Sequence, residues 1–178
     1  MRILVLMGLP GTGKSVVGKA IAKSKGYGYI STGDIARELK DKTWMQKGQL
    51  ADENYVRTRF IEEVEKLITQ EVEGIVVDGM PRTVEQVDFL ASLFFSIDYV
   101  ILDAEHETIF DRLYKRGRED DNFSTITKRI ENQEKALRDI EERIEYLIVS
   151  YRVFDTISCI DTDEKEQEQI IKEVQEVL

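Results

Sequence analysis

The chain has 178 residues, of which 42% are hydrophobic, enough for one compact domain with a substantial core. Its formal net charge of −10 argues against a general affinity for nucleic acid, because phosphate backbones are bound mainly by basic patches. No apolar stretch approaches the ~18 residues of a membrane span and no signal peptide is visible, so we expect a soluble, cytoplasmic protein that binds neither membranes nor nucleic acid. We expect a monomer, and an oligomer is the alternative.

The first predicted element is a buried strand over residues 3–7, and a glycine-rich segment follows it directly. Residues 8–15 match the pattern G-x-x-x-x-G-K-[ST], whose glycines let backbone N–H groups point at phosphate oxygens. Lys14 adds a positive charge, and Ser15 adds a hydroxyl suited to a magnesium shell. The segment predicts a site for a nucleoside triphosphate, formed by Gly8, Pro10, Gly11, Thr12, Gly13, Lys14 and Ser15.

Strand and helix patterns alternate along the rest of the chain. Apolar runs predict further strands at residues 27–30, 75–77, 99–102 and 157–160. Helices are expected near residues 13–26, 52–72, 83–95, 105–116, 125–151 and 164–178, the pattern at 125–151 indicating one long helix or a broken pair. This alternation predicts an α/β fold with helices on both faces of a five-stranded parallel sheet. In the last apolar run we expect Cys159 to be a buried structural thiol.

A carboxylate and several arginines are predicted to lie near the glycine-rich loop. Asp78 follows the strand at 75–77, and parallel strands end at one common edge of the sheet. We therefore expect Asp78 to hold magnesium with Ser15, directly or through water; the alternative is a carboxylate that caps a turn. Phosphoryl transfer needs cations, and five arginines could converge on this edge to supply them: Arg82, Arg112, Arg116, Arg118 and Arg129. The alternative for each arginine is an ordinary position on the surface.

Four segments together resemble the adenylate kinase family of nucleoside monophosphate kinases, and the resemblance spans nearly the whole chain. Residues 8–14 resemble the family's G-x-P-G-x-G-K loop, and residues 29–34 with Arg37 resemble its monophosphate-binding segment. Residues 77–83 with Gln86 resemble its D-G-F-P-R-T motif. The last segment, which resembles the exit of the family's lid and the helix after it, contains Arg118, Asp120, Asp121, Asn122 and Arg129.

This resemblance implies a three-layer α/β/α P-loop kinase fold and reversible, Mg²⁺-dependent transfer of the ATP γ-phosphate to AMP, giving two ADP. Lys14 and the loop would bind the donor phosphates, and Arg112 would stack on the donor adenine. The implied AMP-binding residues are Thr32, Gly33, Arg37, Gly79, Arg82 and Gln86. The implied catalytic residues around the moving phosphoryl group are Lys14, Arg82, Arg116, Arg118 and Arg129, the arginines steadied by Asp120 and Asp121.

Other functions remain open from sequence. The acceptor could be another nucleoside or deoxynucleoside monophosphate, such as CMP or UMP, or the hydroxyl of a small metabolite. A nucleotide-binding module without catalysis is a third reading, although acceptor-side cations have no purpose there.

The chain departs from the family most clearly at the lid. We expect one P-loop kinase domain over 1–178, with a monophosphate-binding insert at 31–60 and a vestigial lid at 112–122 that carries no zinc site. Since a lid excludes water, we expect more nucleotide hydrolysis than in lidded relatives. Trp44 is expected to pack onto the core in preference to lining the acceptor pocket, and His106 to be a solvated residue at a helix start.

Overall fold

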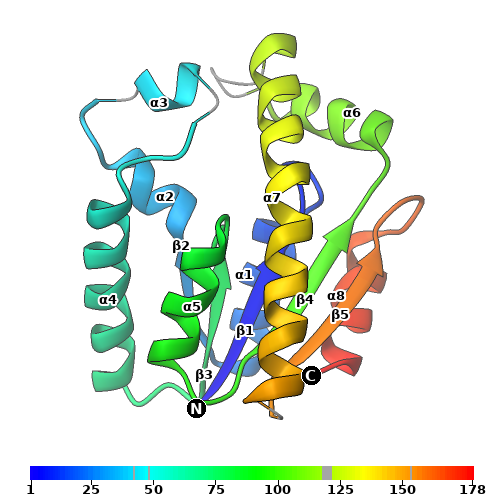
Figure 1. The fold of residues 1–178 in the computed structure, drawn as a ribbon. Coiled ribbons are helices and arrows are strands. Elements are labelled where there is room, and N and C mark those ends of the chain that lie inside the picture. Colours follow the sequence, from blue (N-terminus) through cyan, green and yellow to red (C-terminus); the bar gives the residue numbers. More distant parts are fainter. Residues whose placement is uncertain (42, 48, 118–121, 153) are drawn as a thin grey trace.

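The computed structural model describes residues 1–41, 43–47, 49–117, 122–152 and 154–178. Its centre is a parallel sheet with the strand order β2-β3-β1-β4-β5 (Figure 1). The predicted strands are all present, with slightly shifted ends: β1 (Arg2–Met7), β2 (Gly28–Ser31), β3 (Gly74–Asp78), β4 (Asp98–Asp103) and β5 (Thr156–Asp161).

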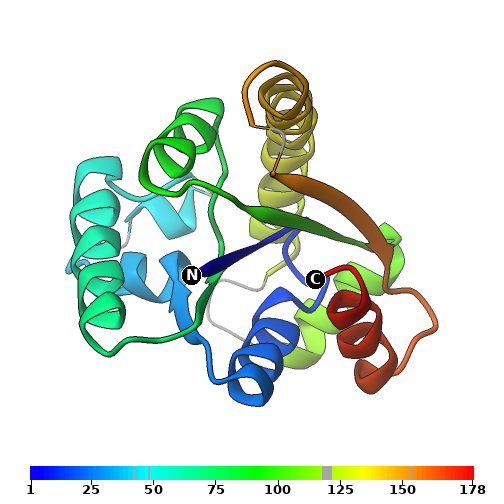
Figure 2. The ribbon, with the colours of Figure 1, turned by 90° about the horizontal axis from the view of Figure 1, so that it is seen from below.

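Helices cover both faces of the sheet, which confirms the three-layer α/β/α fold (Figure 2). One face packs against α4 (Glu53–Thr69), α5 (Val84–Leu93) and α7 (Phe123–Ser150). The other face packs against α1 (Lys14–Lys25) and α8 (Gln167–Glu176). The remaining long helix, α6 (His106–Arg116), packs against the first turns of α7.

The alternation of side chains along β1 explains how one strand serves both layers. Ile3, Val5 and Met7 belong to the core beneath α4, α5 and α7, whereas Leu4 and Leu6 belong to the core beneath α1 and α8. All of these side chains are almost fully buried, as expected for a central strand of a parallel sheet. The rigid sheet therefore fixes the positions of the loops that leave its carboxyl edge.

Several local features differ from the sequence-based expectations. Two short helices, α2 (Thr32–Arg37) and α3 (Thr43–Gln46), were not predicted. Helix α7 is unbroken and starts after Asn122, whose side chain accepts a hydrogen bond from the N–H of Thr125. No helix in the described ranges is long and apolar enough to cross a lipid bilayer.

The expectation that Cys159 is buried is wrong, because its side chain is exposed. The reason is the position of β5, which lies at the edge of the sheet and pairs only with β4. Of the residues in β5, Ile160 alone is buried, on the side covered by α8. An apolar run in the sequence therefore does not distinguish a central strand from an edge strand.

Candidate active site

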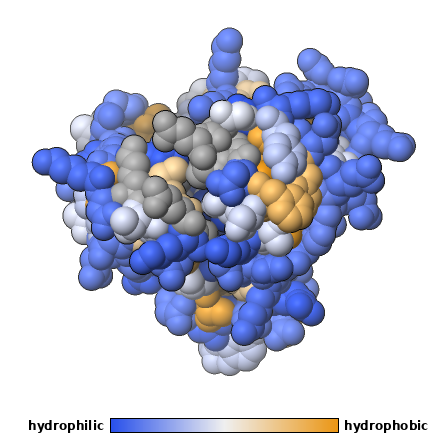
Figure 3. All heavy atoms as spheres, turned by 90° about the horizontal axis from the view of Figure 1, so that it is seen from above, coloured by the Kyte–Doolittle hydropathy of each residue, from blue (hydrophilic) through white to orange (hydrophobic). Residues whose placement is uncertain are grey.

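A cavity of about 900 Å³ opens where β1, β2 and β3 end. Seen from above, the face at this end of the molecule is mostly hydrophilic, with small apolar patches (Figure 3). The cavity brings together the described residues that the sequence nominated, namely Gly8, Pro10, Gly11, Thr12, Gly13, Lys14, Ser15, Thr32, Gly33, Arg37, Asp78, Gly79, Arg82, Gln86, Arg112, Arg116 and Arg129. The other nominated residues, Arg118, Asp120 and Asp121, lie outside the described residues.

The glycine-rich loop turns tightly between β1 and α1. Gly8 has φ +125°, and a Cβ at this position would lie 2.1 Å from the carbonyl oxygen of Leu102, so no other residue fits. The Nζ of Lys14 donates hydrogen bonds to the carbonyls of Gly8 (2.8 Å) and Leu9 (2.5 Å). Gly13 caps α1 and lines the cavity, so the positive end of the α1 dipole faces the space where an anion would bind.

Positive charges are crowded in this cavity. Loss of hydration lowers the pKa of Lys14 to about 8; Arg82, Arg129 and Arg116 lower it as well, while Asp78 opposes them. Loss of hydration and the nearby Arg129 lower the pKa of Arg82 to about 10, so its guanidinium remains charged at neutral pH. A bound polyanion would offset this mutual repulsion, which makes the cavity suited to phosphate groups.

Asp78 lies at the centre of a hydrogen-bonded group below the glycine-rich loop. Its carboxylate is 4% exposed, and its Oδ2 accepts hydrogen bonds from the hydroxyls of Ser15 (2.5 Å) and Tyr29 (2.8 Å). Burial and the Asp78 carboxylate raise the pKa of Tyr29, which keeps its hydroxyl a donor. The pair of Ser15 and Asp78 fits Mg²⁺, which prefers hard oxygen ligands and binds through a few protein groups together with water and phosphate.

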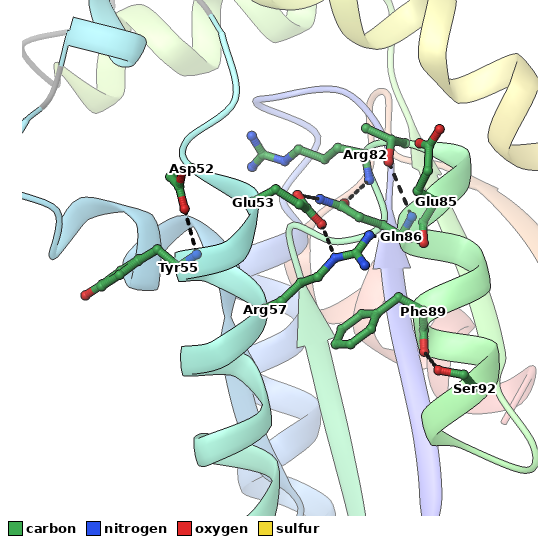
Figure 4. Close-up of polar contacts among 10 residues, drawn as sticks. Asp52, Glu53, Tyr55, Arg57, Arg82, Glu85, Gln86, Phe89 and Ser92 are labelled. Carbon is green, nitrogen blue, oxygen red and sulfur yellow. Dashed lines mark hydrogen bonds and ion pairs between the residues drawn. The ribbon is translucent and has the colours of Figure 1, made fainter.

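The opposite half of the cavity contains the predicted acceptor-side residues. Arg37 donates to Asp34 at 2.9 Å, and the hydroxyl of Thr32 donates to the carbonyl of Asp78 at 3.3 Å. The side chain of Gln86 is 4% exposed and contacts Glu53 and the backbone of Arg82 (Figure 4).

Glu53 also lines the cavity, and sequence reasoning did not identify it. The only signal was an acidic residue in the first turn of a predicted helix, which is common in helices of every function.

The predicted donor-side half lies between α6 and the segment after β5. Arg112 donates from Nη1 to the hydroxyl of Thr162 (2.9 Å) and from Nη2 to its carbonyl (2.7 Å). Since Thr162 is buried, these two bonds fix the plane of the guanidinium at the cavity wall. Lys165 and Gln167 line the same part of the cavity and were not identified from sequence.

The two aromatic residues considered at the sequence level have different surroundings. Trp44 is partly buried, packs against the core beneath α4 and also lines the cavity, so it combines the two expected roles. His106 is the first residue of α6, and its half-exposed ring lies 2.6 Å from a carboxylate oxygen of Glu134, as expected for a solvated residue at a helix start.

Comparisons with known proteins agree with this arrangement. A family model described as an AAA domain matches residues 7–127. An adenylate kinase of Prochlorococcus marinus (strain MIT 9515) is 30% identical in a match that covers 90% of this chain and 90% of the relative. Adenylate kinase 1 of Synechocystis sp. is 34% identical in a match that covers 71% of this chain and 74% of the relative. On these matches, together with the fold and the cavity at the glycine-rich loop, the chain belongs to the adenylate kinase family of nucleoside monophosphate kinases.

Proposed function

We propose that this protein catalyses the reversible, Mg²⁺-dependent transfer of the γ-phosphoryl group of ATP to AMP, giving two ADP. The observation that carries the proposal is a shared cavity, which the glycine-rich loop, Lys14 and Asp78 line together with the acceptor-side residues Arg37 and Arg82. A site for one nucleotide has no use for cations on both sides. Two phosphate chains brought tail to tail need them, because their negative charges repel each other.

In this scheme the phosphate of the acceptor is the nucleophile. One of its oxygens attacks the γ-phosphorus of ATP, a new P–O bond forms, and the bond between the γ-phosphorus and the β,γ-bridging oxygen breaks. Lys14 binds the β- and γ-phosphates of the donor, and Arg82, Arg116 and Arg129 balance the charge that spreads over the transferred oxygens. The protein contributes alignment and positive charge, and no side chain forms a covalent bond. The predicted role of Arg118 in the same group belongs to this proposal.

Magnesium has a defined place in the proposal. Ser15 and Asp78 would hold the ion, directly or through water, and the ion would neutralise charge on the β- and γ-phosphate oxygens. We further propose that residues 31–60 form the acceptor-binding insert and 112–122 a reduced lid, within one P-loop kinase domain. A hydroxyl-bearing acceptor is not favoured, because a neutral hydroxyl does not need both Arg37 and Arg82.

The test is ³¹P NMR of the purified protein with MgATP and one monophosphate at a time: AMP, CMP, UMP, GMP or IMP. With AMP as the acceptor, we expect both ATP and AMP to be converted to ADP. A reaction that starts from ADP alone should approach the same equilibrium mixture. Transfer to CMP or UMP but not to AMP would support the alternative acceptor. ATP consumption that no monophosphate accelerates would contradict the proposal.

A further inference from the structure

Both polar atoms of the buried Gln86 amide are held by fixed partners. Gln86 Oε1 accepts a hydrogen bond from the backbone N–H of Arg82 at 2.6 Å, and its Nε2 donates to Glu53 Oε2 at 2.7 Å (Figure 4). A backbone N–H can only donate, and an ionised carboxylate can only accept. The amide therefore has one orientation, because the flipped amide would place donor against donor and acceptor against acceptor.

Glu53 is itself held in place. Its Oε1 accepts a hydrogen bond from Arg57 Nε at 2.6 Å, and the guanidinium of Arg57 lies over the ring of Phe89, 4.8 Å from the ring centre. Glu53 also occupies the first turn of α4, after the cap residue Asp52, where the helix dipole favours a negative charge. The carboxylate is thus fixed between Arg57 and Gln86 at the wall of the cavity.

The fixed amide determines which edge of a base it can bind. Each amide has two N–H donors and two oxygen lone pairs, so Gln86 retains one of each after its bonds to Glu53 and Arg82. The free oxygen lone pair matches an exocyclic amino group, and the free N–H matches an adjacent ring nitrogen that has no proton. Adenine and cytosine present this pair, whereas hypoxanthine, guanine and uracil present a carbonyl beside a ring N–H.

We propose that Glu53 is a positioning residue that locks Gln86 in the orientation selective for an amino-bearing acceptor base. An oxo-bearing base would require the flipped amide, which sets the Gln86 oxygen against the Glu53 carboxylate and the Gln86 N–H₂ against the Arg82 N–H. This inference rests on the proposed function, since it takes Gln86 to face the acceptor base. Glu53, held by Arg57, thus sets base selectivity together with the backbone N–H of Arg82.

The test compares AMP with IMP, because the two differ only in the edge that Gln86 would read. The ratio of kcat/KM for AMP to kcat/KM for IMP is measured with MgATP as donor in the wild type, in Glu53→Gln and in Glu65→Gln. The new amide at position 53 can offer either its oxygen or its N–H₂, so the contribution of the carboxylate to the lock is lost and only the backbone N–H of Arg82 still favours the wild-type orientation. We expect the AMP:IMP ratio to fall by about 10- to 100-fold in Glu53→Gln, through the KM of the monophosphate and not the KM of ATP. Glu65→Gln makes the same change on the exposed side of α4 and should keep the wild-type ratio.

A ratio in Glu53→Gln within twofold of the wild-type ratio would overturn the proposal, as would an equal loss of activity toward AMP and IMP. Calorimetry can also give the ratio of the dissociation constants of AMP and IMP, and this measurement does not require turnover. A wild type that binds AMP more tightly than IMP but transfers phosphate to neither would therefore refute the proposed function and leave the role of Glu53 testable. If circular dichroism shows that Glu53→Gln is unfolded, Arg57→Gln, which releases the Glu53 carboxylate, replaces it: a lowered ratio supports the proposal and an unchanged ratio overturns it.

Discussion

Replacing Arg82 by Ala separates catalysis from stability more sharply than any other single change in the cavity. The side chain donates a hydrogen bond from Nε to the carbonyl of Gly79 at 2.8 Å. Loss of a hydrogen bond from a charged group costs about 1.5–3 kcal/mol. Removal of a poorly hydrated cation beside Arg129 acts in the opposite direction, because this environment lowers the pKa of Arg82 to about 10. We therefore expect a net change in the free energy of unfolding of no more than about 1 kcal/mol, or about 2–4 °C in Tm.

Activity should respond very differently. Removal of one positioned donor from developing charge typically costs about 100- to 1,000-fold in rate, so kcat for ADP formation from ATP and AMP should fall at least that far in Arg82→Ala. Coupled spectrophotometry measures the rate, and calorimetric unfolding without nucleotide measures Tm. Arg2→Ala is the control, since Arg2 pairs with Asp98 at the amino end of β1, away from the cavity. The reasoning is refuted if Arg82→Ala keeps more than a tenth of wild-type kcat, or if its Tm falls by about 10 °C, well beyond the expected 2–4 °C.

Five further results are expected. In the free protein the pKa of Lys14 is lowered to about 8, whereas bound phosphates favour its ammonium form. Above about pH 8, ATP binding should therefore take up a proton, and the affinity for ATP should fall by up to about tenfold per pH unit. Calorimetry in buffers of different ionisation enthalpy would detect both effects. Because the pKa of Lys14 in the folded protein lies below its unfolded value, the nucleotide-free protein should gain stability as pH rises from about 8 towards 10.5. Lys14→Met should lack both this gain in stability and the proton uptake on ATP binding. Asp78→Asn should raise the Mg²⁺ concentration needed for half-maximal rate by about 10- to 100-fold, measured by Mg²⁺ titration at saturating ATP, and an unchanged requirement would remove Asp78 from the metal site. Phe60→Ala should lower the free energy of unfolding by about 3–5 kcal/mol in urea titrations. The reason is that Phe60 is 0% exposed and its ring centroid lies 6.0 Å from that of Phe89. A loss below about 1 kcal/mol would show that the core relaxes around the gap. ATP hydrolysis without acceptor should be faster than in a lidded adenylate kinase assayed in parallel, because one glycine separates Arg116 from Arg118; equally slow hydrolysis would refute this.

The sequence predicts the fold and many of the polar residues that line the cavity, because these features depend on local patterns. Apolar runs such as residues 3–7 and 75–77 are found as β1 and β3, and the glycine-rich loop lies where its motif requires. Helix α2 was missed because it has six residues and its start is set by the side chain of Ser31, which caps Asp34, so it has no apolar period to detect.

Features that depend on distant contacts could not be predicted from local patterns. Glu53 and Gln86 are 33 positions apart, and they meet because α4 and α5 pack side by side on one face of the sheet. The exposure of Cys159 has a similar origin, since the position of β5 at the sheet edge depends on strand order and not on the composition of the run. Tertiary packing thus decides both the contact between Glu53 and Gln86 and the exposure of Cys159.

We propose that donor and acceptor occupy one cavity with their phosphate chains facing each other. Calorimetry with a bisubstrate molecule, two adenosines joined 5′ to 5′ by five phosphates, tests this claim directly. One molecule should bind per chain with Mg²⁺ present, and the complex should then bind neither ATP nor AMP. Binding of two molecules per chain, or of AMP to the saturated complex, would show that the two nucleotides use separate sites and would contradict the account.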